Sequence, residues 1–187
     1  MGIGWRREDA APGRDLYICK TAQGGTFLAP SSVGGSVTVS NTWHPGEVVT
    51  SSLMHRALAA DWYDTEQALL SQGIGPNLRA LFWMQGEQDA VQQTAADAYQ
   101  AALQALYDDV RLYTSYPSLP IVVARIRGLD PSGTYAATVR TAQAAFVAAN
   151  SAAVLVDTDG MAMAGDNVHY NAAGMKALGQ AFYDAVF

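Results

Sequence analysis

Cysteine and positive charge are both scarce in the sequence. A single cysteine, Cys19, excludes a disulfide within the chain and any metal cluster built from cysteines. Because Cys19 lies in an apolar run, we expect it to be a small buried side chain. Only 15% of the residues are charged, 11 basic against 17 acidic, which gives a net charge of −6. This balance offers no basic surface to nucleic acid or to an anionic membrane.

Long apolar segments are also absent. No apolar run approaches the ~20 residues that span a bilayer. The first fifteen residues, MGIGWRREDAAPGRD, lack the apolar core of a signal peptide. The compartment stays open between the cytoplasm and a virion or extracellular assembly. Half of the 187 residues are apolar, a composition typical of globular proteins, and this length suits a single domain over residues 1–187.

Four short apolar runs predict buried β-strands. They are nearly continuous, as in strands that are covered on both faces, and they lie at residues 16–22, 80–84, 120–126 and 152–158. Helical spacing of apolar residues predicts helices between them, over residues 48–71 and around residues 99–113, 139–149 and 175–185. Strands that alternate with helices predict an α/β sandwich with a mostly parallel sheet.

Polar groups follow the predicted strands, where an open parallel sheet binds its ligands. Asp166 and His169 are three residues apart, before a helix that we expect to begin near Asn171. One turn of irregular backbone can bring that carboxylate onto the imidazole, which would orient His169 as a general base. The alternative is a turn aspartate beside an ordinary surface histidine.

Two further segments offer hydrogen-bond donors. Gly24 and Gly25 follow the first predicted strand, and a tight glycine turn can point backbone N–H groups at a developing oxyanion. Gln85 follows the second strand and could supply a side-chain donor, while Glu87 and Asp89 could brace that loop. The alternatives are a plain loop at the glycines and a hydrated turn that caps a helix at Asp89.

Aromatic residues give candidates for sugar contact. The long irregular stretch at residues 23–46 contains Trp43 and His44, and Tyr170 follows the candidate base. A loop of that length in a small domain is usually functional. His55 lies on a predicted helix, and we expect it at the surface. Metal binding is disfavoured, because the sequence has no HExxH motif and no pair of histidines on one helix face.

Three blocks, KTAQGGT, LFWMQGEQDA and DNVHYNAAGMKALG, occur in this order. Together they resemble the SGNH-hydrolase superfamily, in its carbohydrate-esterase branch of sialate O-acetylesterase-like and acetyl-xylan-esterase-like proteins. The resemblance extends from Leu16 onward. It implies a flavodoxin-like three-layer α/β/α fold and a serine esterase that removes O-acetyl or similar small acyl groups from carbohydrate, without cofactor or metal. It also implies an oxyanion hole at Gly24 or Gly25 and Gln85, with His169 as base and Asp166 as its partner.

The sequence departs from this family at the nucleophile. The family's serine block precedes the glycine block, at the end of its first strand, and the first fifteen residues here contain no serine. Ser31, Ser32 and Ser36 lie after the glycine pair in no matching context. No residue is therefore assigned as the nucleophile.

The missing block has a structural consequence. In the family's strand order, 2-1-3-4-5, the absent strand would lie between residues 16–22 and 80–84. A gap there would leave unpaired backbone groups, each costing roughly 1–3 kcal/mol when buried. Three outcomes would avoid the gap: another polypeptide supplies the strand to a shortened chain, the two strands pair directly, or a partner chain or second copy adds a strand.

Two functions remain open from the sequence. One is a carbohydrate O-acetyl esterase, complete or completed by a missing segment, which would act on an acetylated glycan. The other is a non-catalytic SGNH-like module that binds glycan or has a structural role, for example in a phage particle. Loss of the nucleophile favours the second, whereas the intact Asp166 and His169 favour the first.

Overall fold

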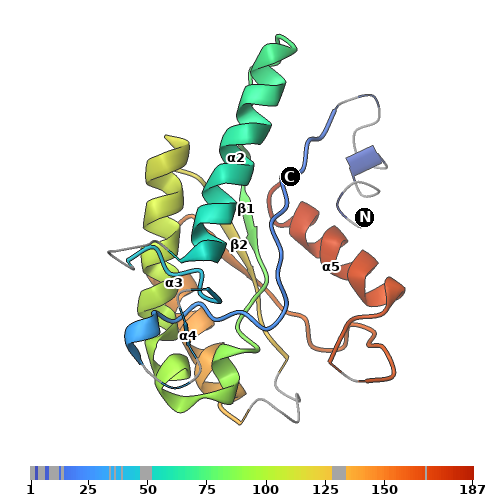
Figure 1. Cartoon of the computed structure of the whole chain (residues 1–187). Coiled ribbons are helices and arrows are strands. Elements are labelled where there is room, and N and C mark those ends of the chain that lie inside the picture. The colour runs from blue at the N-terminus through green and yellow to red at the C-terminus, as the bar shows by residue number, and fades with distance from the viewer. Residues whose placement is uncertain are drawn as a thin grey trace.

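The parallel sheet lies at the centre of the fold. A computed structural model describes residues 3, 7–8, 13, 15–33, 35, 37–38, 40–46, 52–127, 134–166 and 168–187. Its strands are β1 (Leu81–Trp83), β2 (Ile121–Ala124) and β3 (Ala153–Val156), which pair in this order and all run parallel (Figure 1). The predicted strands at 80–84, 120–126 and 152–158 are thereby confirmed, each shorter than its apolar run.

Helices cover the sheet on both sides. The longer ones are α2 (Leu53–Ser71), α3 (Gln93–Thr114), α4 (Ala136–Ala149) and α5 (Ala172–Asp184), and two single turns are η1 (Ser31–Val33) and η2 (Asp89–Val91). Figure 1 shows α2, α3 and α4 on one side of the strands and α5 on the other. The α/β/α arrangement expected from the sequence is confirmed. No helix of the described segments is long and apolar enough to cross a membrane.

The central strand explains why the apolar runs are continuous. Ile121 and Val123 pack into the cluster formed with α3 and α4, whereas Val122 and Ala124 pack toward α5. All four side chains are at most 1% exposed. Since successive residues of a strand point to opposite faces, a strand covered on both faces needs an apolar residue at every position.

Helix α3 contributes the largest share of the core. Tyr99, Leu103 and Leu106 lie on its buried stripe and are fully inaccessible to solvent. Phe146 of α4 packs edge-on against Tyr107, with the ring centroids 5.6 Å apart. The helical spacing in the sequence placed most of the buried residues of α3 and α4 correctly, because residues three and four apart share one face; Ala149, at the end of α4, is exposed.

Helix α5 begins where the sequence indicated. The Asn171 side chain accepts a hydrogen bond from the Gly174 amide at 3.0 Å and caps the helix. Phe182 stacks on Phe82 of β1 at 5.0 Å and covers the second face of the sheet. Met175, expected on the buried stripe, is 50% exposed. Met175 shares a face of α5 with Phe182, because seven residues make nearly two full turns, but it lines an open cavity there.

The predicted strand at residues 16–22 is wrong. This segment has no strand pairing and runs as an irregular chain past β1, between α2 and α5 (Figure 1). Tyr17 and Ile18 are 50% and 53% exposed, and Cys19 is only half-buried. Direct pairing of this segment with β1 therefore does not occur. Strand-like composition alone does not make a strand, because the backbone groups also need a neighbouring chain.

His55 is buried rather than on the surface. It is 7% exposed, and its Nε2 lies 2.7 Å from Asp109 Oδ2 on α3. The packing of α2 against α3 turns this position inward, which periodicity alone did not reveal. The predicted helix start at residues 48–51 lies outside the described residues, and α2 begins at Leu53 after the cap at Ser52.

Replacing Leu103 tests the core assigned to α3. Leu103→Ala removes a fully buried side chain, and we expect the free energy of unfolding to fall by about 2–5 kcal/mol in urea titrations followed by circular dichroism. Leu112→Ala is the matched control on the same helix, where the side chain is 77% exposed; it should change stability by less than about 0.5 kcal/mol. Equal losses in the two variants would contradict the assignment.

Candidate active site

The loop after β1 turns sharply at Gly86. This residue has a φ of +141°, and an added Cβ would lie 2.9 Å from Ile126 Cγ2 and 3.0 Å from Val139 Cγ1. Only glycine accepts both this conformation and this close approach. The turn lies between Gln85, two residues after the end of β1, and Asp89, which begins η2.

Asp89 is a buried anchor for this loop. Its carboxylate accepts hydrogen bonds from the amides of Leu28 and Ala29, at 2.9 and 2.8 Å, and from Gln85 Nε2 at 2.6 Å. Burial raises the pKa of Asp89 to about 6, although the hydrogen bonds from Leu28 and Gln85 act in the opposite direction. The carboxylate thus ties the loop after β1 to the segment that follows the glycine turn.

Gln85 braces the same junction. Its side-chain amide donates to the Thr26 carbonyl at 2.9 Å as well as to Asp89, so both of its hydrogens are used. The expected role of Gln85 as an oxyanion donor is therefore not supported by its present hydrogen bonds. The physical reason is its burial, since an unpaired buried amide is costly and the nearby acceptors take its hydrogens.

Two buried polar residues hold the backbone of Gln85. The Tyr99 hydroxyl donates to the Gln85 carbonyl at 2.6 Å, and Gln143 Nε2 lies 3.3 Å from the same oxygen. Gln143 also accepts from the Ile126 amide at 3.0 Å, which joins the ends of β1 and β2. The sequence analysis missed Gln143. The sequence feature that could have revealed Gln143 is its position as a polar residue beside the apolar stripe of α4.

The glycine turn leaves its amides available. Gly24 and Gly25 are exposed, and Gly25 has a φ of +68°, a conformation that favours glycine. In the described part of the chain, neither amide has a hydrogen-bond acceptor. These two N–H groups are thus available as hydrogen-bond donors near the hydrogen-bonded pair of Gln85 and Asp89.

Asp166 and His169 form a hydrogen-bonded pair. Asp166 Oδ2 lies 2.8 Å from His169 Nδ1, and Oδ1 accepts from the amides of Val168 and His169 at 3.0 Å each. Hydrogen bonds from the His169 amide and ring hold the pKa of Asp166 well below its usual range. The carboxylate in turn raises the pKa of His169. The pair is open to solvent, with the His169 side chain 78% exposed.

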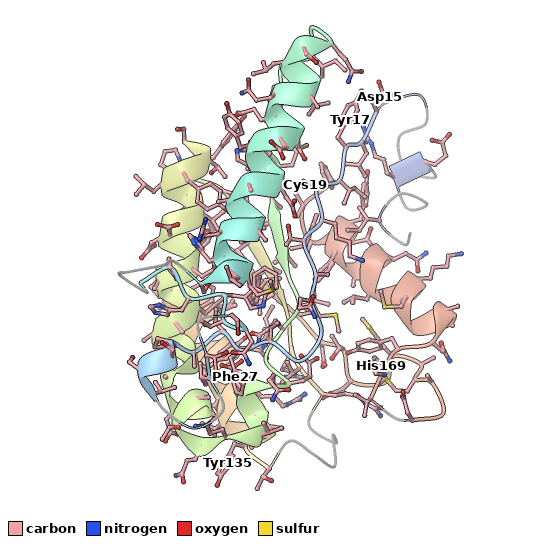
Figure 2. The ribbon with its side chains drawn as sticks, viewed as in Figure 1. Asp15, Tyr17, Cys19, Phe27, Tyr135 and His169 are labelled. Carbon is pink, nitrogen blue, oxygen red and sulfur yellow. The ribbon has the colours of Figure 1, made fainter. Side chains whose placement is uncertain are left out.

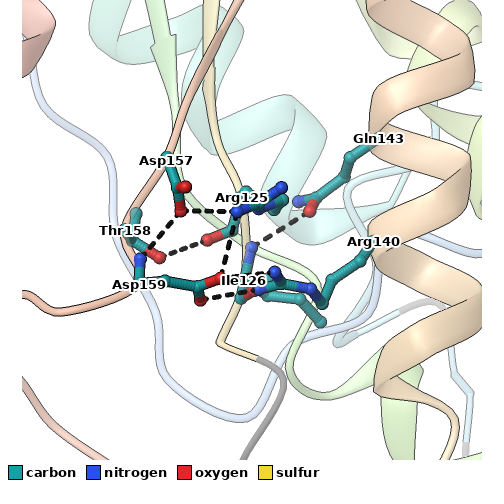
Figure 3. A network of polar contacts seen from close by, with 7 residues as sticks. All are labelled: Arg125, Ile126, Arg140, Gln143, Asp157, Thr158 and Asp159. Carbon is teal, nitrogen blue, oxygen red and sulfur yellow. Dashed lines mark hydrogen bonds and ion pairs between the residues drawn. The ribbon is translucent and has the colours of Figure 1, made fainter.

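An arginine–aspartate network secures the base of the loop that carries this pair (Figure 3). Asp159, just after β3, is bound by Arg140 of α4 at 2.7 Å and by Arg125 at 3.0 Å. Asp157 lies 2.6 Å from Arg125, and the Thr158 hydroxyl donates to the Arg125 carbonyl at 2.6 Å. The network fixes the start of the loop against two neighbouring elements.

The far end of the same loop folds back on itself. Met163 and Tyr170 form an antiparallel bridge, and the Ala164 amide donates to the His169 carbonyl at 2.7 Å. Gly174 permits close contact of α5 with this loop, because an added Cβ would lie 2.1 Å from the Ala162 carbonyl oxygen. The backbone around His169 is therefore held on both sides.

Glu87 connects the two loops electrostatically. Its charge contributes to the raised pKa of His169, where Asp166 is the larger cause, and to the raised pKa of Tyr170, where burial is the larger cause. Figure 2 shows His169 at the same end of the molecule as Phe27, which follows the glycine turn. Gly25 lies beside the loop that carries Glu87, since an added Cβ there would be 4.0 Å from Gln88 Oε1.

The candidate sugar contacts have different environments. Trp43 is 4% exposed, packs edge-on against Trp83 at 5.6 Å and donates to the Thr26 hydroxyl, so the structure gives it a packing role. His44 is half-buried, and its Nδ1 accepts from the Gly46 amide at 3.0 Å. Tyr170 is half-buried beside His169. Sugar contact by His44 or Tyr170 stays a prediction.

Within the described segments, no side chain is placed as a nucleophile for His169. Ser31 and Ser32 lie in η1, and no serine or threonine hydroxyl of the described residues is hydrogen-bonded to His169. Ser36 lies outside the described residues. No cluster of three or more His, Cys, Asp or Glu side chains able to hold a metal ion occurs among the residues that the structure describes.

Comparison with known proteins identifies the family. Residues 15–187 match the family described as carbohydrate esterase, sialic acid-specific acetylesterase. The chain belongs to this carbohydrate esterase family. It is 29% identical over 152 residues to a probable carbohydrate esterase of Arabidopsis thaliana, across 81% of this chain and 52% of the relative.

The fold of this family member resembles a solved structure as well. An X-ray structure of an Arabidopsis thaliana protein superposes with a TM-score of 0.64 at 25% identity, over 81% of this chain and 56% of that one. The resemblance found in the three sequence blocks is confirmed. The chain spans about half the length of the relatives it matches.

The buried Asp89 should make stability depend on pH. The folded state keeps its proton up to about pH 6, whereas the unfolded state loses it near the ordinary pKa of 3.8. The free energy of unfolding contributed by Asp89 therefore falls as pH rises between these values, by about 3 kcal/mol in all. Urea titrations from pH 4 to 7 should show the difference between wild type and Asp89→Asn shrinking across this window.

The test depends on how the stability difference between wild type and Asp89→Asn changes with pH. Its absolute size is not informative, because Asp89→Asn also loses acceptors for Leu28 and Ala29 at every pH. Asp64→Asn, at an exposed position on α2, is the control and should follow the wild-type curve. A difference between wild type and Asp89→Asn that stays constant with pH would contradict a raised pKa at Asp89.

Removing the carboxylate beside His169 should lower the pKa of the histidine. Asp166→Asn loses the charge that stabilises the imidazolium, so His169 should lose its proton at a lower pH than in wild type. The measurement is a pH titration of the imidazole Cε1–H by NMR, with Asp64→Asn as the control. Overlapping His169 titration curves in wild type and Asp166→Asn would show that the pair does not form in solution.

Proposed function

We propose that this chain supplies the acid–base group and the oxyanion donors of a carbohydrate O-acetyl esterase. The observation that carries the proposal is the 2.8 Å contact between Asp166 Oδ2 and His169 Nδ1. It is the geometry that a general base requires, because the carboxylate fixes one tautomer and stabilises the imidazolium. Membership in the carbohydrate esterase family supports the substrate class.

The chemistry follows from the free nitrogen. With Nδ1 held by Asp166, His169 Nε2 is left to accept a proton from an attacking hydroxyl, whose oxygen bonds to the ester carbonyl carbon. The amides of Gly24 and Gly25 would stabilise the resulting oxyanion. His169 then returns the proton to the sugar oxygen as the bond from carbon to that oxygen breaks, and water releases the acetate in a second cycle.

The source of the attacking hydroxyl stays unassigned. A serine from polypeptide outside the described residues would give an acyl-enzyme, while a water activated by His169 would hydrolyse the ester in one step. The second route is much slower, because a triad enzyme without its nucleophile retains only a residual ~10³–10⁴-fold effect over water.

A second candidate function is a non-catalytic module that binds glycan or has a structural role in a larger assembly. The observation in its favour is that no described hydroxyl is hydrogen-bonded to His169. Stoichiometric glycan binding without ester turnover would support it.

Hydrolysis of p-nitrophenyl acetate separates the two candidates. An esterase should lose about 100-fold or more of its rate in His169→Ala. Its rate should also rise with pH as His169 loses its proton, because only the neutral imidazole accepts one. Tyr63→Ala, at an exposed position on α2, is the control and should keep the wild-type rate. Equal rates in wild type and His169→Ala would rule out the esterase for this chain.

A further inference from the structure

A mainly apolar stripe lies on the exposed side of α2. Residues three and four apart share one face of a helix, and the stripe, called here the outer stripe, consists of Leu53, Arg56, Ala60, Tyr63, Gln67 and Leu70. All of these residues are exposed. The large apolar side chains are the most informative, since Leu53, Tyr63 and Leu70 are 50%, 60% and 49% exposed.

The outer stripe takes no part in packing α2 onto its own chain. The opposite side of the helix does this through His55, Trp62 and Leu69, which are buried. His55 and Trp62 pack edge-on against Tyr113 and Tyr116. Figure 1 shows the C-terminal half of α2 extending beyond α3 and the strands. The outer stripe therefore faces solvent along the whole helix.

The spacing of the outer stripe is that of a helix that packs against another helix. Its positions alternate by three and four residues, like the a and d positions of a heptad, where side chains of two helices interlock. The outward face of a surface helix is normally polar, whereas four of these six positions are apolar. Ala57, Ala59 and Ala68 lie beside the outer stripe and are small, which would let a second helix approach closely.

The apolar positions are complementary to those of a second copy that runs antiparallel. A twofold axis midway between Ala60 and Tyr63 places Leu53 opposite Leu70 of the second copy, at both ends of the contact. The same axis places Ala60 opposite Tyr63, so a small side chain meets a large one at the centre. Alternation of small and large residues is what lets two facing layers interlock.

The polar positions fit the same register. Arg56 would lie opposite Gln67 of the second copy and beside Glu66, the residue that precedes Gln67. Within the described ranges, neither Arg56 nor Glu66 forms an ion pair. Antiparallel packing brings these opposite charges together twice, once near each end of the contact. Parallel packing would place Arg56 against Arg56, and like charges repel.

We propose that the chain forms a homodimer in which the outer stripes of two α2 helices pack antiparallel about a twofold axis. Such a contact uses the same surface on both copies, so it closes at the dimer. One pair of helices buries less than the ~1,200–2,000 Å² of stable complexes, and we expect a weak dimer with a Kd on the order of 10 µM. The inference does not depend on esterase activity, because no residue of the outer stripe belongs to the candidate active site.

Sedimentation velocity of the 187-residue chain tests the dimer. The weight-average sedimentation coefficient should rise from that of a monomer to that of a dimer between about 1 and 300 µM. Tyr63→Glu places two carboxylates at the centre of the contact and should weaken association about tenfold or more. Leu112→Glu is the matched control, since it replaces an apolar side chain that is 77% exposed on α3; it should leave association unchanged. Circular dichroism checks that both variants fold.

Charge reversal tests the register. Arg56→Glu and Glu66→Arg should each weaken the dimer, because each single change makes like charges face one another across the contact. The double variant Arg56→Glu/Glu66→Arg restores opposite charges, and its Kd should return to within about threefold of the wild-type value. Restoration by the second change cannot come from a general loss of helix stability.

Cysteine cross-linking distinguishes the two helix directions. In a Cys19→Ser background, Leu53→Cys and Leu70→Cys proteins should form a disulfide-linked dimer when they are mixed and oxidised. Neither should cross-link with itself, because the two copies of residue 53 lie about 25 Å apart in the antiparallel register. Cross-linking of Leu53→Cys with itself would indicate parallel packing and overturn the proposed arrangement.

Three other results would overturn the proposal. The first is a monomer at every concentration up to about 300 µM. The second is a dimer that Tyr63→Glu does not weaken, or that Leu112→Glu weakens equally, because the contact would then lie elsewhere. The third is a double charge variant that associates as weakly as the single variants.

Discussion

The buried carboxylate of Asp89 is the contact on which the carboxyl end of the sheet depends. It joins the amides of Leu28 and Ala29, which follow the glycine turn, to the Gln85 side chain in the loop after β1. Because a buried carboxylate needs partners at both oxygens, the two segments are held in one arrangement. The glycine turn therefore keeps its position although residues 16–22 form no strand.

The candidate site combines a rigid brace with an exposed base. Gln85 and Asp89 are buried and bonded to each other, while His169 is almost fully open to solvent. The loop that carries His169 is nevertheless fixed at its start by Arg125, Arg140 and Asp159. The orientation of this loop is therefore set by backbone and salt-bridge contacts.

Much of this arrangement could be predicted from the sequence, and the failures have a common cause. The strands at 80–84, 120–126 and 152–158 were predicted because continuous apolar runs are typical of strands covered on both faces, and in β2 all four side chains are buried in this way. Residues 16–22 have the same composition but no neighbour, so the prediction failed. Gln85 was expected to be a free donor, but Asp89 and Thr26 take its hydrogens. Contacts between distant segments decided both cases.

The sequence by itself determined the α/β class, the helical stripes and the order of the three blocks that identify the family. These properties depend on local spacing and residue type, which the chain carries wherever it folds. The tertiary structure alone decided that β1 is an edge, that His55 and Trp43 are buried, and that Gln143 joins the ends of two strands. These features depend on contacts between segments that are distant in the sequence. Such contacts determine which side chains are buried and which groups form hydrogen bonds.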